Sequence, residues 1–260
     1  MGIEHIQSID DPRLSVFRDL PNSKAARDQG KFIAEGVVLV DRLFETGYSV
    51  ESLLLEKKHL GRYRQFESQT SLLVADGMVD EIIGFDFHRG VLACARRPEP
   101  PRLEQMVSQA VTRTTFVVCI SVCDQENLGG IIRSAAAFGA DCMLIDSTSA
   151  DPFARRVMRV SMGTNLKLPI CQSADLLADL RRLQQDHGVQ IVATTLDESA
   201  TKLNEFMRPD RAAILFGNEG HGLDAEWLDL ADNQVTIPMQ LDTDSLNVAV
   251  SAGIVLYALM

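Results

Sequence analysis

The sequence lacks the patterns that bind metals or form disulfide frameworks. Its 260 residues include five cysteines, which lie mostly inside apolar runs and show no paired ligand spacing: Cys94, Cys119, Cys123, Cys142 and Cys171. The one close pair, Cys119 and Cys123, has no second pair or histidine cluster beside it. We therefore interpret the cysteines as reduced core residues and predict no metal site.

Long apolar runs and a leader segment are also missing. No signal peptide precedes the first predicted helix, and no apolar run before the final segment is long enough to span a bilayer. The final segment is itself too short and too rich in small residues. We therefore expect a cytoplasmic protein without a membrane partner.

Basic residues are in deficit. Lys and Arg number 25 against 36 Asp and Glu, which gives a formal net charge of -11. This balance argues against nonspecific binding to nucleic acid, although local basic surfaces remain compatible with it. Basic side chains gather at 13–31 and at 57–64, and charge alone favours solvated faces for both.

Proline is concentrated at one place, which marks a boundary. Three prolines within four residues of "RRPEPPRLEQM" cannot continue a helix or a central strand. With 46% hydrophobic residues, the chain is long enough for two domains with their own cores. We place a front domain at 1–98, a linker at 99–111 and a back domain at 112–260.

The front domain is predicted to be a small α/β unit. Helix-favouring residues stop at Gly30 and resume as an apolar-periodic helix that ends near Gly47. Three short strands follow, "VESLLLE", "SLLVAD" and "GVLACAR".

The back domain alternates strands with helices, which predicts a mainly parallel sheet covered on both faces. The expected strands are "TTFVVCISV", "CMLID", "QIVATTL", "AAILFG" and "QVTIPM", with helices near 151–161, over 174–188 and at the end of the chain. Ligands of such sheets bind outside the carboxyl ends of the strands. That rule selects the turns after Val122, Phe216 and Met239.

The first of these turns, "CDQENLGG", is expected to open a helix over "IIRSAAAFG". Arg133 points away from the apolar stripe of this helix, so it is either an ordinary surface arginine or a ligand contact. Asn127 with Gly129 and Gly130 at the helix start favours a ligand contact, because backbone amides and a guanidinium would face one region.

The second turn, "FGNEGHGLD", carries three glycines around Glu219. Such density permits close approach of a ligand to the backbone, although a plain tight loop is the alternative. The turn lacks the lysine of a P-loop and the G-x-G-x-x-G spacing of a dinucleotide fold. A Rossmann-type methyltransferase or dehydrogenase is therefore disfavoured.

The third turn precedes the closing helix, in "IPMQLDTDSLNVAVSAG". Asp244 or Ser245 is expected to cap that helix, with Asn247 in its first turn. A routine cap explains Ser245, but it explains Asn247 less well, since asparagine is a mediocre helix former.

Together, "NLGGIIRSAAAFG", "LFGNEGHGLD" and "IPMQLDTDSLNVAVSAG" resemble, in this order, the three motifs of the SpoU (TrmH) family of RNA 2′-O-ribose methyltransferases in the SPOUT superfamily. "RVSMGTNLKLPI" is similar to the family's segment between the first two. In the front domain, "SKAARDQGKFIAEG" and "HRGVLACARRP" are similar to a ribosomal-protein-like RNA-binding domain. The resemblance covers nearly all 260 residues.

The resemblance implies a small α/β RNA-binding domain followed by a SPOUT domain whose mainly parallel sheet is closed by a deep trefoil knot. It also implies a homodimer that builds each site from both subunits. S-adenosylmethionine is the implied methyl donor, bound by Thr194, Thr195, Gly217, Glu219, Gly220, Ile237, Met239 and Leu246.

The implied catalytic group consists of Arg133 with Asn127, Glu219, Ser245 and Asn247. Because a guanidinium stays protonated, we expect Arg133 to hold phosphate and stabilise the forming alkoxide rather than to act as a base. RNA contacts are expected from Arg18, Lys24, Arg27 and Lys31, and from Arg155, Arg156 and Arg159.

The expected substrate is ribosomal RNA rather than transfer RNA, because the front domain resembles a ribosomal-protein module. An RNA-binding protein without catalysis is the rival hypothesis, and resistance methylation is a narrower form of the first. One departure from the family pattern is Leu241, followed by Asp242 and Asp244, where a glycine is common. These residues add negative charge near the expected donor pocket.

Overall fold

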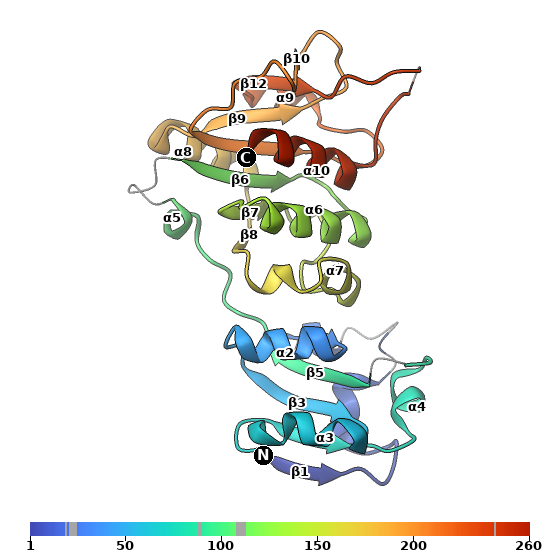
Figure 1. Ribbon diagram of the computed structural model, residues 1–260. Coiled ribbons are helices and arrows are strands. Elements are labelled where there is room, and N and C mark those ends of the chain that lie inside the picture. Colours follow the sequence, from blue (N-terminus) through green and yellow to red (C-terminus); the bar gives the residue numbers. More distant parts are fainter. Residues whose placement is uncertain (19, 21–24, 88–89, 108–112, 242) are drawn as a thin grey trace. The chain divides into compact units, whose positions relative to one another are not determined.

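The computed structural model describes residues 1–260 other than 19, 21–24, 88–89, 108–112 and 242. They form two compact units, Met1–Glu99 with Phe153–Leu166, and Pro100–Pro152 with Lys167–Met260 (Figure 1). The segment Phe153–Leu166, assigned from the sequence to the back domain, thus packs with the first unit.

The first unit is built on a five-stranded sheet in the order β1-β4-β3-β5-β2. β1 and β3 lie parallel to β4, whereas β5 is antiparallel to β3 and β2. The strands are β1 (Gly2–His5), β2 (Lys31–Glu35), β3 (Val50–Leu55), β4 (Ser71–Val74) and β5 (Val91–Arg96). The helices are η1 (Pro12–Phe17), α1 (Ala25–Asp28), α2 (Val37–Glu45), α3 (Lys57–Tyr63), η2 (Arg64–Phe66), α4 (Val79–Ile83), α7 (Arg155–Val160) and η3 (Thr164–Leu166).

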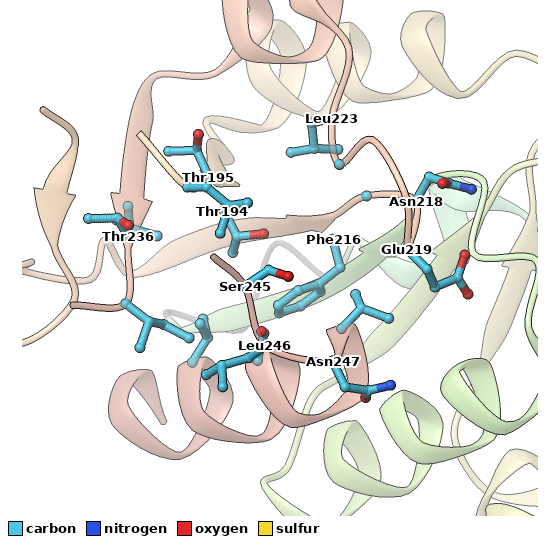
Figure 2. A pocket seen from close by; sticks show the side chains of 18 of the residues that line it. Thr194, Thr195, Phe216, Asn218, Glu219, Leu223, Thr236, Ser245, Leu246 and Asn247 are labelled. Carbon is cyan, nitrogen blue, oxygen red and sulfur yellow. The ribbon is translucent and has the colours of Figure 1, made fainter. Parts of the chain in front are cut away.

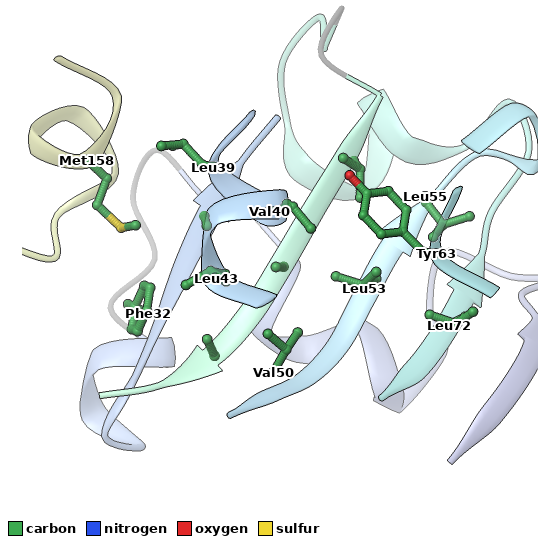
Figure 3. Close-up of a cluster of buried hydrophobic side chains, with 14 of the residues drawn as sticks. Phe32, Leu39, Val40, Leu43, Val50, Leu53, Leu55, Tyr63, Leu72 and Met158 are labelled. Carbon is green, nitrogen blue, oxygen red and sulfur yellow. The ribbon is translucent and has the colours of Figure 1, made fainter. Parts of the chain in front are cut away.

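Cores lie on both faces of this sheet, which explains the consecutive buried apolar residues in β3, β4 and β5. Successive side chains of a strand point to opposite faces. Leu53 and Leu55 accordingly join one core with α2, shown in Figure 3, while Leu54 joins a second core with α4. Met158 of α7 belongs to the first of these cores.

One prediction for this unit was wrong. Residues 31–35, expected to resume a helix after Gly30, form strand β2 instead. β2 pairs antiparallel with β5, and its Phe32 and Ile33 enter the two opposite cores. Tertiary pairing therefore overrides local helix preference here, and Gly36, at φ 94°, makes the turn into α2.

The second unit confirms the predicted parallel sheet. Seven strands lie in the order β10-β12-β9-β11-β6-β7-β8, and every pairing between them is parallel. They are β6 (Thr114–Cys119), β7 (Cys142–Ile145), β8 (Ile170–Gln172), β9 (Gln190–Thr194), β10 (Thr201–Lys202), β11 (Arg211–Phe216) and β12 (Asn233–Thr236). The helices are α5 (Leu103–Met106), α6 (Gln125–Ala137), α8 (Leu176–His187), α9 (Ala225–Leu230) and α10 (Val248–Leu259).

Helices α6 and α10 lie side by side through small residues (Figure 1). A Cβ on Gly130 would come within 2.9 Å of the Ala249 Cβ, and one on Gly253 within 3.7 Å of the Ser134 Oγ. Close packing thus requires glycine at 130, although glycine is a poor helix former. The expected polar turn through Gly130 is instead helical from Gln125, because the Asp124 side chain accepts hydrogen bonds from the next amides and caps α6.

Four cysteines are buried as expected, but Cys123 is exposed just before α6. Burial is the main cause that raises the pKa of the Cys94 thiol to about 11 and the pKa of the Cys142 thiol to about 12. Both thiols therefore stay protonated at neutral pH. Within the described ranges, no helix is long and apolar enough to cross a bilayer. Those ranges also hold no cluster of three metal-ligating side chains.

Candidate active site

A cavity of about 430 Å³ lies at the carboxyl ends of β9, β11 and β12, beside the start of α10. Figure 2 shows Thr194 and Thr195 on one side of it, with Ser245, Leu246 and Asn247 near α10. Every residue predicted to bind the cofactor lines it: Thr194, Thr195, Gly217, Glu219, Gly220, Ile237, Met239 and Leu246. The cavity therefore lies at the sheet edge that the sequence rule selected for ligand binding.

Other lining residues had not been singled out from the sequence. Asn218 and Leu223 lie within the glycine-rich motif, so their position in the motif was an available signal. Leu203 and Val255 come from distant elements and gave no local signal, because only the fold brings them to the cavity. With Phe216 they supply an apolar wall suited to a flat aromatic ring.

The glycine-rich turn after β11 is closed by its own backbone. Asn218 N donates to Gly222 O at 3.0 Å, and Gly222 N donates to Asn218 O at 2.9 Å. A Cβ on Gly217 would lie 2.4 Å from the carbonyl carbon and oxygen of Gly222. Gly217 is therefore required by close backbone approach, whereas Gly222 is favoured by its left-handed φ of 72°.

Three turns that are far apart in sequence meet in one hydrogen-bond network. Glu219 Oε1 accepts from the Asp124 backbone N–H at 3.0 Å and from Asn127 Nδ2 at 3.1 Å. Asn247 Nδ2 then donates to Asn127 Oδ1 at 2.7 Å. Both ends of the Asn127 amide are thus used, and this side chain links the glycine-rich turn to the closing helix.

The Glu219 carboxylate is held in its ionised form. Burial would raise its pKa, but hydrogen bonds from Asn127 and from the backbone of 123–124 and 219 outweigh that effect and lower the pKa. An ionised carboxylate accepts stronger hydrogen bonds than a neutral one. Glu219 therefore anchors the start of α6 to the glycine-rich turn.

Asn247 itself caps the closing helix, so the expectation of a cap at Asp244 or Ser245 was wrong. Its Oδ1 accepts from Ala249 N at 2.9 Å and Val250 N at 3.3 Å, and α10 begins at Val248. Because Asn247 Nδ2 is free to reach Asn127, one asparagine both starts the helix and fixes the network. Ser245 lies two residues earlier and lines the cavity.

Arg133 is not brought to this cavity. Its side chain is exposed on α6, and it is absent from the lining among the described residues. Within the same described part of the chain, its guanidinium makes no hydrogen bond or ion pair. The structure thus joins Asn127, Glu219 and Asn247 in one network with Ser245 at the cavity, and leaves Arg133 outside it.

Comparison with known proteins gives this constellation a family. A profile described as the SpoU rRNA Methylase family matches residues 114–257, which is more than half of the chain. The chain belongs to the SpoU family. All three turns of the site lie within the matched residues.

Relatives of the SpoU chain extend over its whole length. A Mycobacterium bovis protein named as an uncharacterized tRNA/rRNA methyltransferase is 36% identical over 99% of this chain and 91% of its own. A Bacillus subtilis protein named as a 23S rRNA guanosine 2′-O-methyltransferase is 25% identical over 99% of both chains. A solved structure described as the AdoMet-bound rRNA methyltransferase from Sinorhizobium meliloti has a TM-score of 0.84 at 26% identity, covering 98% of this chain and 97% of that one.

The basic residues predicted to bind RNA differ in their surroundings within the first unit. Arg18 donates to the Asp11 carbonyl at 2.7 Å, and Lys31 pairs with Glu51 at 2.8 Å. Arg27 is exposed. Lys24 lies outside the described residues. An RNA phosphate that binds Lys31 would therefore compete with the Glu51 carboxylate.

Arg155 is held inside the first unit of this SpoU chain. It pairs at 2.9 Å with Glu35, which is 4% exposed, and its guanidinium lies 5.0 Å from the Phe85 ring centroid. Removing it would leave a buried carboxylate without this partner. Its position favours a structural role, whereas Arg156 is exposed and Arg159 is half-buried.

Proposed function

We propose that this chain methylates a ribose 2′-hydroxyl in structured RNA, with S-adenosylmethionine as the methyl donor and ribosomal RNA favoured over transfer RNA as substrate. The carrying observation is a cavity of about 430 Å³ that adjoins the Glu219–Asn127–Asn247 network. Family membership and the AdoMet-bound S. meliloti structure support the donor. The rRNA names of the B. subtilis and S. meliloti proteins support the substrate.

The cavity suits the proposed donor in size and in its mixture of surfaces. Its volume lies within the range of about 300–1,000 Å³ that is usual for small-molecule sites. Leu203, Phe216 and Val255 would face the adenine ring, while Thr194 and Gly220 offer polar and backbone groups. S-adenosylmethionine, when bound, supplies an electrophilic methyl group on a sulfonium.

The chain's own part in the reaction is to position an alcohol and to support its loss of a proton. Asn127, Glu219 and Asn247 hold the edge of the cavity rigid, and Ser245 presents a hydroxyl beside it. Arg133 would hold the RNA phosphate and stabilise the alkoxide that forms. A fixed positive charge favours the deprotonated alcohol without acting as a base, and the hydroxyl proton would pass to solvent water as the oxygen takes up the methyl group.

A homodimer would bring Arg133 to a cavity. Within one chain Arg133 stands apart from the lining, although it belongs to the first of the three motifs. α10 exposes three apolar side chains at helical spacing, Val250, Ile254 and Tyr257, of which Tyr257 is 75% exposed. Such a stripe favours a protein partner. We infer that two α10 helices pair and that each cavity receives Arg133 from the partner subunit.

A threaded tail would account for the path of the last segment. β12 lies beyond β9 in the sheet, whereas α10 packs on α6, which follows β6 on the other side of β11. Ile237 and Met239 after β12, and Ser245 and Leu246 before α10, line the same cavity as the turn 217–223. We propose that the path of this last segment forms the deep trefoil knot of SPOUT domains.

We propose 1–98 as the RNA substrate domain, 99–111 as the linker and 112–260 as the methyltransferase domain, of which the segment Phe153–Leu166 packs with the first unit. Arg18, Arg27 and Lys31 are the proposed phosphate contacts there, joined by Lys24. Arg156 and Arg159 are the favoured contacts of the second arginine group, since Arg155 holds Glu35.

Methyl transfer from isotopically labelled S-adenosylmethionine to purified ribosomal and transfer RNA tests the proposal. Nucleoside mass spectrometry should find label on a ribose of ribosomal RNA. Arg133→Ala should abolish methyl transfer, while the Kd for the donor changes less than about twofold. The control is Arg181→Ala, which removes an exposed arginine from α8 and should retain full activity. Label in transfer RNA alone would show that transfer RNA, not ribosomal RNA, is the substrate. Donor binding without methyl transfer would favour an RNA-binding protein that lacks catalysis.

A further inference from the structure

Asp146 lies at the carboxyl end of β7 and gathers the loops around it. Its Oδ2 accepts from Ser121 N at 3.0 Å, Ser121 Oγ at 3.3 Å and Thr148 Oγ1 at 2.5 Å. Its Oδ1 accepts from Ser149 N at 2.9 Å and Ser149 Oγ at 2.6 Å. One half-buried carboxylate thereby ties the loop after β7 to the loop after β6.

These hydrogen bonds keep Asp146 ionised. Burial would raise its pKa, but the bonds from Ser149, Thr148 and the Ser121 backbone outweigh burial and lower the pKa. Both carboxylate oxygens therefore act as hydrogen-bond acceptors at neutral pH. The five donors around Asp146 require this, because a protonated oxygen would itself be a donor.

Ser121 adopts a backbone conformation that serine rarely takes. Its φ is 54°, in the left-handed region that is unfavourable for residues with a Cβ. Such conformations persist where the surroundings over-determine them. Here the Asp146 carboxylate fixes both the amide and the hydroxyl of Ser121.

Two hydrogen bonds connect Ser121 to the lining of the cavity. Its carbonyl accepts from Asn218 Nδ2 at 2.8 Å, and Asn218 Oδ1 accepts from Gly220 N at 2.8 Å. Asn218 and Gly220 both line the cavity, and Glu219 lies between them. A rotation of Ser121 out of the left-handed region would turn its carbonyl away from Asn218 and release the glycine-rich turn.

We propose that Asp146 is a positioning residue for donor binding, acting through the left-handed Ser121 and Asn218 on the glycine-rich turn. The inference rests on the proposed function, since it takes S-adenosylmethionine as the occupant of the cavity. Asp146 itself does not line the cavity among the described residues, so its effect is transmitted.

Calorimetric titration of S-adenosylmethionine into five variants of the 260-residue chain tests this relay. Asp146→Ala should raise the Kd about tenfold, the effect of a left-handed conformation that has lost its support. The matched control is Asp141→Ala, which removes a carboxylate that accepts from Thr115 N at 2.8 Å at the opposite end of β6. It should leave the Kd unchanged, and thermal unfolding of both variants reports any general loss of stability.

Ser121→Gly provides the decisive coupling, because glycine adopts a positive φ without a Cβ penalty. It should bind the donor nearly as well as the wild type, and in its background Asp146→Ala should cost less than about threefold. An equal loss in both backgrounds, or an Asp146→Ala variant with wild-type affinity, would overturn the relay. The single substitution Ser121→Val leaves Asp146 in place but disfavours the left-handed conformation, so it should weaken donor binding by itself. This variant tests the relay even if Asp146→Ala does not fold. Failure of the wild type to bind donor would refute the proposed function instead.

Discussion

Gly217→Ala should weaken donor binding far more than Gly220→Ala, although both glycines line the cavity. A Cβ at 217 would meet the Gly222 carbonyl carbon and oxygen at 2.4 Å and Leu223 N at 2.7 Å. These are backbone atoms of the same turn, so no side-chain rotation can relieve the clash. A Cβ at 220 would meet only Asn218 Oδ1, at 3.4 Å, an ordinary contact.

The size of the effect follows from what the clash must break. To restore ordinary contact, the two strands of the turn must separate by about 1 Å, which opens the paired hydrogen bonds between Asn218 and Gly222. Two hydrogen bonds at about 0.5–1.5 kcal/mol each give a loss of about 1–3 kcal/mol, or roughly 5- to 150-fold in Kd.

Calorimetry with S-adenosylmethionine measures both variants under one set of conditions. Gly217→Ala should raise the Kd within that range, whereas Gly220→Ala should stay within about twofold of the wild type. Equal affinities for the two variants would refute the view that close backbone approach at 217 shapes the donor site.

Two further predictions concern assembly and pH. If two α10 helices pair as proposed, the wild type should be a dimer in light scattering at micromolar concentration, and Ile254→Glu on the exposed face of α10 should be a monomer. A wild-type protein that is monomeric and active would contradict the proposed shared site. Since the pKa of Glu219 is lowered by folding, its contribution to stability is present above the ordinary value of 4.5 and is lost as pH falls through the folded pKa. The difference in Tm between wild type and Glu219→Gln should therefore persist at neutral pH and narrow below about 4.5, and a difference that grows on acidification would contradict the anchor role.

The sequence predicted most of the second unit because its strands are long apolar runs followed by turn residues. Parallel strands also direct their carboxyl ends to one edge, so the cavity could be located before any contact was known. The same reasoning failed at 31–35, where pairing with β5 decides the conformation. It also placed the helix cap two or three residues early, since Asp244, Ser245 and Asn247 are all good capping residues.

The hydrogen bonds within the site could not be predicted from the sequence. Asn127 and Glu219 are 92 positions apart, and their hydrogen bond depends on how β6 and β11 pair. The left-handed Ser121 carries no sequence signal, because serine is uncommon in that conformation. The exposed Leu241, at φ 58°, stands where the family pattern commonly has glycine, and the sequence flagged it only through that resemblance.

Ribose methylation of ribosomal RNA by this chain can be measured by mapping 2′-O-methyl groups in RNA from cells with and without the protein. One ribose methylation in ribosomal RNA should disappear when the gene is deleted, and it should return with the wild-type chain but not with Arg133→Ala. Identical maps in all three strains, or a lost methyl group that sits on a base, would contradict the proposed activity.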